Sequence, residues 1–159
     1  MRYIDLLHKA HKDELKIRRA RRRPPEALER LVRELSSEIS SGIPILVEGY
    51  RDVEALFRGF GPGNYIRIYR KNITLRAVVQ DSIERFGRRQ IIMTDLDKKG
   101  NLLAEKIMRI INDIGGVGIL RYRTIMRLMN TQFVEAIDYE EIKRILWDID
   151  IDISPRPEI

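Results

Sequence analysis

Short apolar runs alternate with amphipathic segments through the middle of the chain. The runs carry strand-like patterns and comprise residues 43–48, 65–69, 89–95 and 117–122. The segments between them repeat apolar side chains every three or four positions, as helices do, and comprise residues 52–61, 74–87 and 100–115. Because strands that alternate with helices form parallel sheets with helical crossovers, we predict an α/β fold whose four-stranded parallel sheet is flanked by helices.

Helical patterns also precede this region. Residues 3–19 repeat apolar side chains at helical spacing, and a second helix opens at Pro25 and carries an apolar stripe from Leu28 to Ile39. We therefore expect a helical extension over residues 1–40, followed by an α/β domain over residues 41–137.

The last part of the chain, residues 138–159, predicts a further helix and an acidic tail. Asp138 and Glu141 have the spacing of a capping box for a helix that runs through Trp147. The stretch WDIDIDI then alternates acids with isoleucines. This alternation leaves open an edge strand, an ordered arm on a partner and a frayed tail.

Composition narrows the chemistry. The 159 residues include no cysteine, which excludes disulfides, a zinc ribbon and a thiol nucleophile. No apolar run approaches the roughly 20 residues of a membrane span, and the charged N-terminus lacks the apolar core of a signal peptide. We therefore expect a cytoplasmic protein without a membrane partner. Charged residues make up 34% of the chain, which is typical of thermophile proteins.

The net charge of +6 favours polyanionic partners, nucleic acid before acidic lipid. The bases are densest in KIRRARRR (16–23), where we expect a basic helical arm that grips phosphates. An alternative is a solvated helix face paired with acids such as Asp13 and Glu14. The arginines of the arm are Arg18, Arg19, Arg21, Arg22 and Arg23.

Acidic residues stand at the ends of two predicted strands. Glu48 ends the first strand, Asp95 ends the third, and Asp97 follows two residues later. Because the C-terminal ends of parallel strands share one edge of the sheet, we expect these carboxylates to lie together. They would stay ionised together only beside a cation, and hard oxygen ligands suit Mg²⁺ or Mn²⁺. The alternative is three surface acids at the starts of loops.

Two stretches resemble the motifs of the Toprim domain, the catalytic module of topoisomerases, bacterial primases and an RNA-maturing nuclease. They are LVEGYRDVEAL, with Glu48-Gly49, and IIMTDLDKKGNLLAEKI, with Asp95-Leu96-Asp97 and then Gly100. The resemblance implies a Rossmann-like Toprim fold over residues 41–137. It also implies that Asp95 and Asp97 hold Mg²⁺, while Glu48 acts as general acid or base or completes the metal site. Asp52 would assist the metal, or it would simply favour the start of the following helix.

The chain is similar to the small stand-alone Toprim proteins of archaea and some bacteria. It has no room for a topoisomerase's separate tyrosine domain and no cysteines for a primase's zinc domain. The resemblance implies Mg²⁺-dependent phosphodiester chemistry by a small nuclease on structured RNA, with RNA favoured over DNA. Two alternatives stay open: a non-catalytic module that binds nucleic acid or ribonucleoproteins, and a primase-like DNA-processing subunit that needs a replication or repair partner. The oligomeric state also stays open.

Further bases flank the acids. Lys98 and Lys99 directly follow Asp97, and Arg121 and Arg123 follow the fourth predicted strand. We expect these bases to contact the nucleic-acid backbone. The alternative is that the lysines offset the repulsion among the acids and that the arginines are ordinary surface charges.

Overall fold

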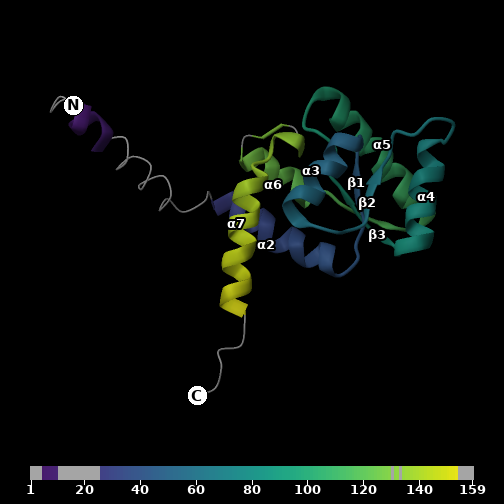
Figure 1. The fold of residues 1–159 in the computed structure, drawn as a ribbon. Coiled ribbons are helices and arrows are strands. Elements are labelled where there is room, and N and C mark those ends of the chain that lie inside the picture. The colour runs from purple at the N-terminus through teal and green to yellow at the C-terminus, as the bar shows by residue number, and fades with distance from the viewer. Residues whose placement is uncertain (1–4, 11–25, 130, 133, 154–159) are drawn as a thin grey trace, which may run out of the picture.

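The alternating strands and helices build a sheet that is covered on both faces (Figure 1). The computed structural model describes residues 5–10, 26–129, 131–132 and 134–153, with the backbone alone for residues 150–153. The strands are β1 (Ile45–Val47), β2 (Tyr65–Arg67), β3 (Arg89–Ile92) and β4 (Val117–Ile119). Residues 5–10 are helical. The other helices are α2 (Glu26–Ser40), α3 (Tyr50–Phe60), α4 (Leu75–Phe86), α5 (Lys98–Ile114), α6 (Arg121–Leu128), the 3₁₀-helix η1 (Val134–Ala136) and α7 (Tyr139–Ile153).

The predicted four-stranded parallel sheet is confirmed, and its strand order is β2-β1-β3-β4. In its register, Ile45 of β1 lies between Tyr65 of β2 and Ile91 of β3. The chain therefore passes from β1 to β2 on one side of β1, whereas β3 and β4 extend the sheet on the other side of β1. In open parallel sheets such a reversal of strand order creates a crevice at the carboxyl ends of the strands, where ligands bind.

The central strands are buried on both faces, which explains their continuous apolar runs. Ile45 and Val47 of β1 belong to the core formed with α2, α3, α6 and α7, whereas Leu46 belongs to the core formed with α4 and α5. Ile91 and Ile92 of β3 divide in the same way. Figure 1 shows these two helix layers on opposite sides of the sheet. Along the described residues, no helix combines the length and the apolar character that crossing a membrane requires.

The C-terminal helix is longer than the sequence pattern indicated. α7 continues past Trp147 to Ile153, so the edge strand left open for this stretch is wrong. The reason is that Ile142, Ile145 and Ile149 recur at helical spacing and pack into the core with α2. At its start, the Glu141 N–H donates to Asp138 Oδ1 at 3.1 Å, which is half of the expected capping box.

Candidate metal and nucleic-acid site

The acid Glu48 follows β1 directly and faces the end of β3. Its Oε1 accepts a hydrogen bond from the backbone N–H of Asp95 at 3.2 Å. The pKa of Glu48 is raised, chiefly by burial and then by the negative charges of Asp95, Asp97 and Asp52. Glu48 therefore meets the backbone of the Asp-x-Asp segment at the carboxyl edge of the sheet, where the strand order reverses.

Asp95 lies just beyond β3 and is held by a distant segment. Its Oδ1 accepts a hydrogen bond from the Val134 N–H of η1 at 3.0 Å. Burial raises the pKa of Asp95, and the charges of Asp97 and Glu135 add to the effect. The hydrogen bond from Val134 and the charge of Arg123 act in the opposite direction.

Asp97 begins α5. Its Oδ1 accepts from the Gly100 N–H at 2.7 Å, which makes Asp97 the helix N-cap and places Lys98 in the first turn. A Cβ at Gly100 would lie 1.9 Å from the Asp95 carbonyl oxygen and 2.9 Å from Glu48 Oε1. No side chain fits there, so the glycine of the second motif allows the acids to approach one another.

Asp52 has a structural task as well as a place near the site. It is only 6% exposed, and its Oδ2 accepts from the Gly49 N–H at 3.0 Å at the start of α3. Burial raises the pKa of Asp52 to about 6, with the charges of Asp95 and Glu135 adding to the effect and the Gly49 hydrogen bond opposing it.

Glu135 is a further acid that the sequence patterns did not single out. It belongs to η1, and its charge raises the pKa values of Asp52, Asp95 and Tyr139. No strand end or motif marks it in the sequence. It reaches the acids because η1 folds back onto the end of β3, where the Leu96 N–H donates to the Gln132 carbonyl at 2.6 Å.

Arg123 lies on α6 and is only 9% exposed. Its guanidinium donates to the backbone carbonyls of Thr94 and Asp95 at 3.1 and 2.9 Å, and to Asn101 Oδ1 at 2.6 Å. Burial and the neighbouring Arg127 lower its pKa, whereas the nearby acids raise it. These contacts tie α6 to the end of β3 and to α5, so Arg123 braces the peptide that carries Asp95.

The other bases considered from the sequence lie in different surroundings. Lys98 and Lys99 are exposed on the first turn of α5, and the Lys99 ammonium lies 4.9 Å from the centre of the Tyr69 ring. Arg121 turns towards α2, where it pairs with Glu38. The arginines of residues 16–23 lie outside the described residues.

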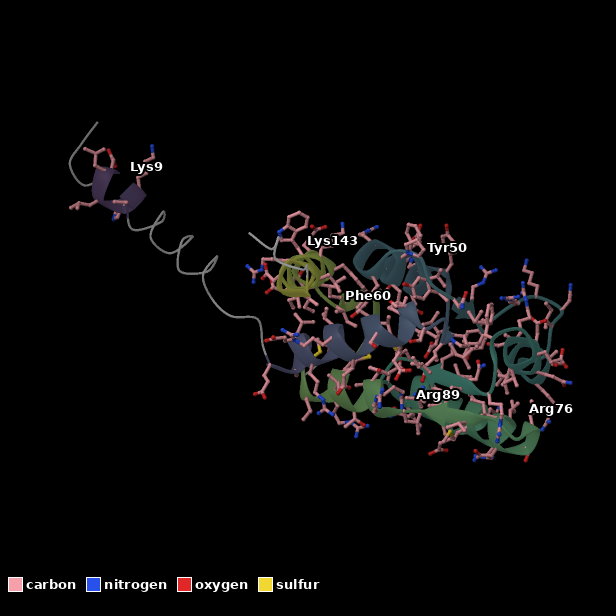
Figure 2. All side chains as sticks on the ribbon, turned by 90° about the horizontal axis from the view of Figure 1, so that it is seen from below. Lys9, Tyr50, Phe60, Arg76, Arg89 and Lys143 are labelled. Atoms are coloured by element: carbon pink, nitrogen blue, oxygen red, sulfur yellow. The ribbon has the colours of Figure 1, made fainter. Side chains whose placement is uncertain are left out.

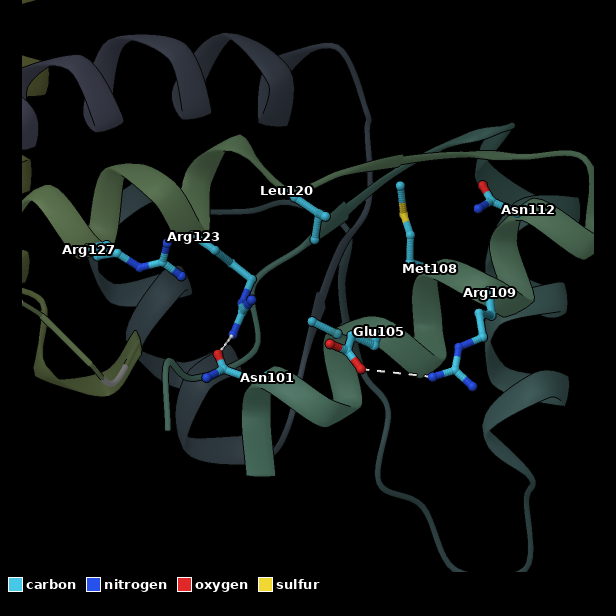
Figure 3. A pocket seen from close by; sticks show the side chains of 9 residues that line it. Asn101, Glu105, Met108, Arg109, Asn112, Leu120, Arg123 and Arg127 are labelled. Carbon is cyan, nitrogen blue, oxygen red and sulfur yellow. Dashed lines mark hydrogen bonds and ion pairs between the residues drawn. The ribbon is translucent and has the colours of Figure 1, made fainter. Parts of the chain in front are cut away.

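A hollow of about 570 Å³ adjoins Arg123 between α5 and α6 (Figure 3). Figure 3 shows the Arg123–Asn101 hydrogen bond at one end and the Glu105–Arg109 ion pair nearer the other. Arg127 also lines this hollow. The lining of this hollow therefore combines three arginines with the apolar side chains of Ala104, Met108 and Leu120.

The donor set of the acids fits Mg²⁺ or Mn²⁺. Carboxylate oxygens are the ligands these ions prefer, and Mg²⁺ needs only one or two of them because it keeps several waters. The shared rise in the pKa values of Glu48 and Asp95 is the rise that a bound cation would relieve. In the part of the chain that the structure describes, no group of three or more acidic, histidine or cysteine side chains already converges on one cation position. Each of the four acids has one oxygen that accepts a backbone N–H, namely Glu48, Asp52, Asp95 and Asp97.

Comparison with known proteins identifies the family of this chain. The Toprim domain model matches residues 42–123, which include Glu48, Asp95, Asp97 and Gly100. The UPF0292 protein of Methanosarcina barkeri is 30% identical over 113 residues, which cover 71% of this chain and 77% of that protein. The UPF0292 protein of Methanosarcina acetivorans is 29% identical over 113 residues, 71% of this chain and 76% of that protein. A solved structure of a putative protein from Aquifex aeolicus superposes with a TM-score of 0.61 at 26% identity, over 71% of this chain and 100% of that one. The chain therefore belongs to the Toprim family.

Proposed function

We propose that this chain is a Mg²⁺- or Mn²⁺-dependent nuclease that hydrolyses phosphodiester bonds in structured RNA. The observation that carries the proposal is the hydrogen bond between Glu48 and the Asp95 N–H where the strand order reverses, with the charge of Asp97 near enough to raise the pKa of Glu48. Toprim domains are typically metal-binding catalytic domains that act on nucleic acids, and this chain carries one.

Each acid has a distinct part in the proposed reaction. Asp95 and Asp97 would hold the cation with the carboxylate oxygens that do not accept a backbone N–H. Bound Mg²⁺ supplies polarisation of the phosphate and activation of water. Glu48 would take or return a proton, because its raised pKa brings it closer to neutral pH, where a general acid or base is most effective.

Basic groups near the acids would position the substrate. Lys98 and Lys99 follow the metal-binding segment directly and would contact phosphates beside the one that is cut. Arg123 would act indirectly, by fixing the peptide of Asp95 through two carbonyl hydrogen bonds. We favour RNA over DNA as the substrate because this small, simple chain resembles the RNA-maturing nuclease of the family.

A non-catalytic nucleic-acid-binding module is the second candidate. One observation favours it: Asp97 caps α5, and Asp52 accepts the N–H of Gly49, the N-cap of α3, so these acids have structural tasks that need no cation. On this reading the chain would bind nucleic acid equally well in EDTA and would cut nothing.

Cleavage of end-labelled RNA, single-stranded DNA and duplex DNA in Mg²⁺, Mn²⁺ or EDTA separates the two functions. The nuclease proposal predicts metal-dependent cutting that is lost in Asp95→Asn/Asp97→Asn, while binding is retained or becomes tighter as repulsion of phosphate falls. Asp113→Asn, an exposed acid on α5 paired with Arg76, is the matched control and should cut normally. Binding without cutting in the wild type would favour the second candidate. Activity confined to a co-purified complex would instead indicate a subunit that needs its partner.

A further inference from the structure

A groove of about 530 Å³ opens beside the first turns of α5, and it shares only Glu105 and Arg109 with the lining of the hollow next to Arg123. Six residues of its lining supply an aromatic ring, an apolar side chain and four bases. They are Tyr69, Lys98, Lys99, Leu102, Lys106 and Arg109.

The groove follows one face of α5. Lys98, Leu102, Lys106 and Arg109 are spaced three or four residues apart, so they lie above one another on the helix surface. From Lys98 to Arg109 the helix rises about 16 Å at 1.5 Å per residue. That length corresponds to roughly five stacked nucleotides at 3.4 Å each.

The surface of the groove combines apolar and basic groups. The side chains of Tyr69 and Leu102 are 47% and 57% exposed. Bases surround them, and the single acid in the lining, Glu105, lies within 3.9 Å of Arg109. Exposed aromatic and apolar groups among excess positive charge are complementary to a nucleic-acid strand, whose bases stack while its phosphates pair with the cations.

The groove is joined to the acids by the backbone. The Tyr69 N–H, just beyond β2, donates to the Glu48 carbonyl at 3.4 Å. On the other wall, Lys98 follows Asp97 directly. A strand lying in the groove would therefore enter or leave beside the candidate metal site.

We propose that this groove binds a single-stranded segment of nucleic acid, with an unpaired base stacked on Tyr69 and the flanking phosphates on Lys98, Lys106 and Arg109. A single strand is required because the bases of a duplex are stacked inside it and cannot lie on a side-chain ring. Lys99, which lies over the Tyr69 ring in the free protein, moves from the ring to a phosphate when the base arrives. The proposal deepens the proposed function, on which its biological meaning rests, by naming unpaired nucleotides beside the cut as the feature recognised.

The test is the affinity of short fluorescein-labelled oligonucleotides, measured by anisotropy in EDTA so that no cutting intervenes. The probes are a single-stranded RNA, an abasic strand of the same length, and a blunt duplex. Tyr69→Ala should weaken binding of the single strand roughly tenfold and leave the abasic strand and the duplex unchanged. Tyr69→Phe should bind as the wild type does, because the ring is retained. Lys106→Ala/Arg109→Ala should weaken binding of the single and abasic strands and flatten the salt dependence by roughly 1.4 in slope.

Tyr50→Ala is the matched control. Tyr50 is another exposed tyrosine, at 60%, but it lies on α3 and lines a different hollow together with Lys143; both residues are labelled in Figure 2. The proposal is overturned if Tyr50→Ala and Tyr69→Ala are equal in effect, or if Tyr69→Ala weakens the abasic strand as much as the normal one. It is also overturned if the wild type prefers the duplex.

The two proposals fail in different ways. A wild type that binds single strands through Tyr69 but never cuts them would refute the nuclease and leave the groove. A wild type that cuts RNA while Tyr69→Ala keeps full affinity and selectivity would refute the groove and leave the nuclease.

Discussion

Glu48 Oε1, just beyond the end of β1, accepts a hydrogen bond at 3.2 Å from the backbone N–H of Asp95, just beyond the end of β3. This contact joins the Glu-Gly motif to the Asp-x-Asp motif, although 47 residues separate the two in the chain. It lies where the strand order reverses, which is the edge at which open parallel sheets bind their ligands.

Gly100 should tolerate no side chain. The Cβ of Gly100→Ala would lie 1.9 Å from the Asp95 carbonyl oxygen and 2.9 Å from Glu48 Oε1, so the ends of β3 and α5 must move apart. We expect a loss of about 3 kcal/mol in the free energy of unfolding, measured by urea denaturation. Gly49→Ala is the control from the first motif. A Cβ there meets nothing within 4 Å, so its effect should stay within about 1 kcal/mol. Equal losses in the two variants would contradict the close approach at Gly100.

Asp52 should make stability depend on pH. Its pKa of about 6 in the folded chain exceeds the unfolded value of about 3.9, so the folded state favours the protonated carboxyl. The contribution of the protonated Asp52 carboxyl to the free energy of unfolding is fully present below about pH 4, and it is lost as the pH rises through about 6. Asp52→Asn keeps an acceptor for the Gly49 N–H and removes the charge.

We therefore expect Asp52→Asn to raise the free energy of unfolding by about 2 kcal/mol near neutral pH in EDTA, and to change it little near pH 4. Urea titrations at both pH values check this expectation. A variant that is destabilised at both pH values would show that the charged carboxylate stabilises the start of α3 instead.

Arg123 should stabilise the folded chain through its hydrogen bonds to two backbone carbonyls, beyond any effect of its charge. Arg123→Met would leave the carbonyls of Thr94 and Asp95 without the donor that now satisfies them in a buried position. The expected cost is about 3 kcal/mol of unfolding free energy. Arg127→Met, one turn later on the exposed side of α6, should change stability by less than about 0.5 kcal/mol. If both variants unfold alike, then Arg123 does not brace the peptide of Asp95.

The elements of this fold follow closely from local sequence patterns. The apolar runs at β1 and β3 are buried on both faces, and the amphipathic repeats of α4 and α5 match the single core that they cover. Local patterns contain no information on strand order, since pairing depends on contacts between distant segments. For a related reason, the acid–isoleucine alternation from Trp147 onwards did not distinguish a strand from a helix. The helix α7 continues because Ile149 packs onto the core that includes α2, a contact that the local pattern cannot show.

The candidate site was predictable where residues stand at strand ends, and less so where tertiary contacts assign the roles. Glu48 and Asp95 come together because parallel strands align their carboxyl ends. Glu135 lies on a short 3₁₀-helix that meets Asp95 only after the chain has folded back, so no local signal marks it. Arg123 looked like a surface base in the sequence, and its burial arises from the packing of α6 beside β3.

The most direct test of this account is Mn²⁺ binding followed by electron paramagnetic resonance, which detects the loss of the free-ion signal. We predict that the wild type binds Mn²⁺ in competition with Mg²⁺, that Asp95→Asn/Asp97→Asn loses this binding, and that Asp113→Asn retains it. Equal binding by the wild type and by Asp95→Asn/Asp97→Asn would contradict the claim that the acids at the ends of β1 and β3 hold a divalent cation.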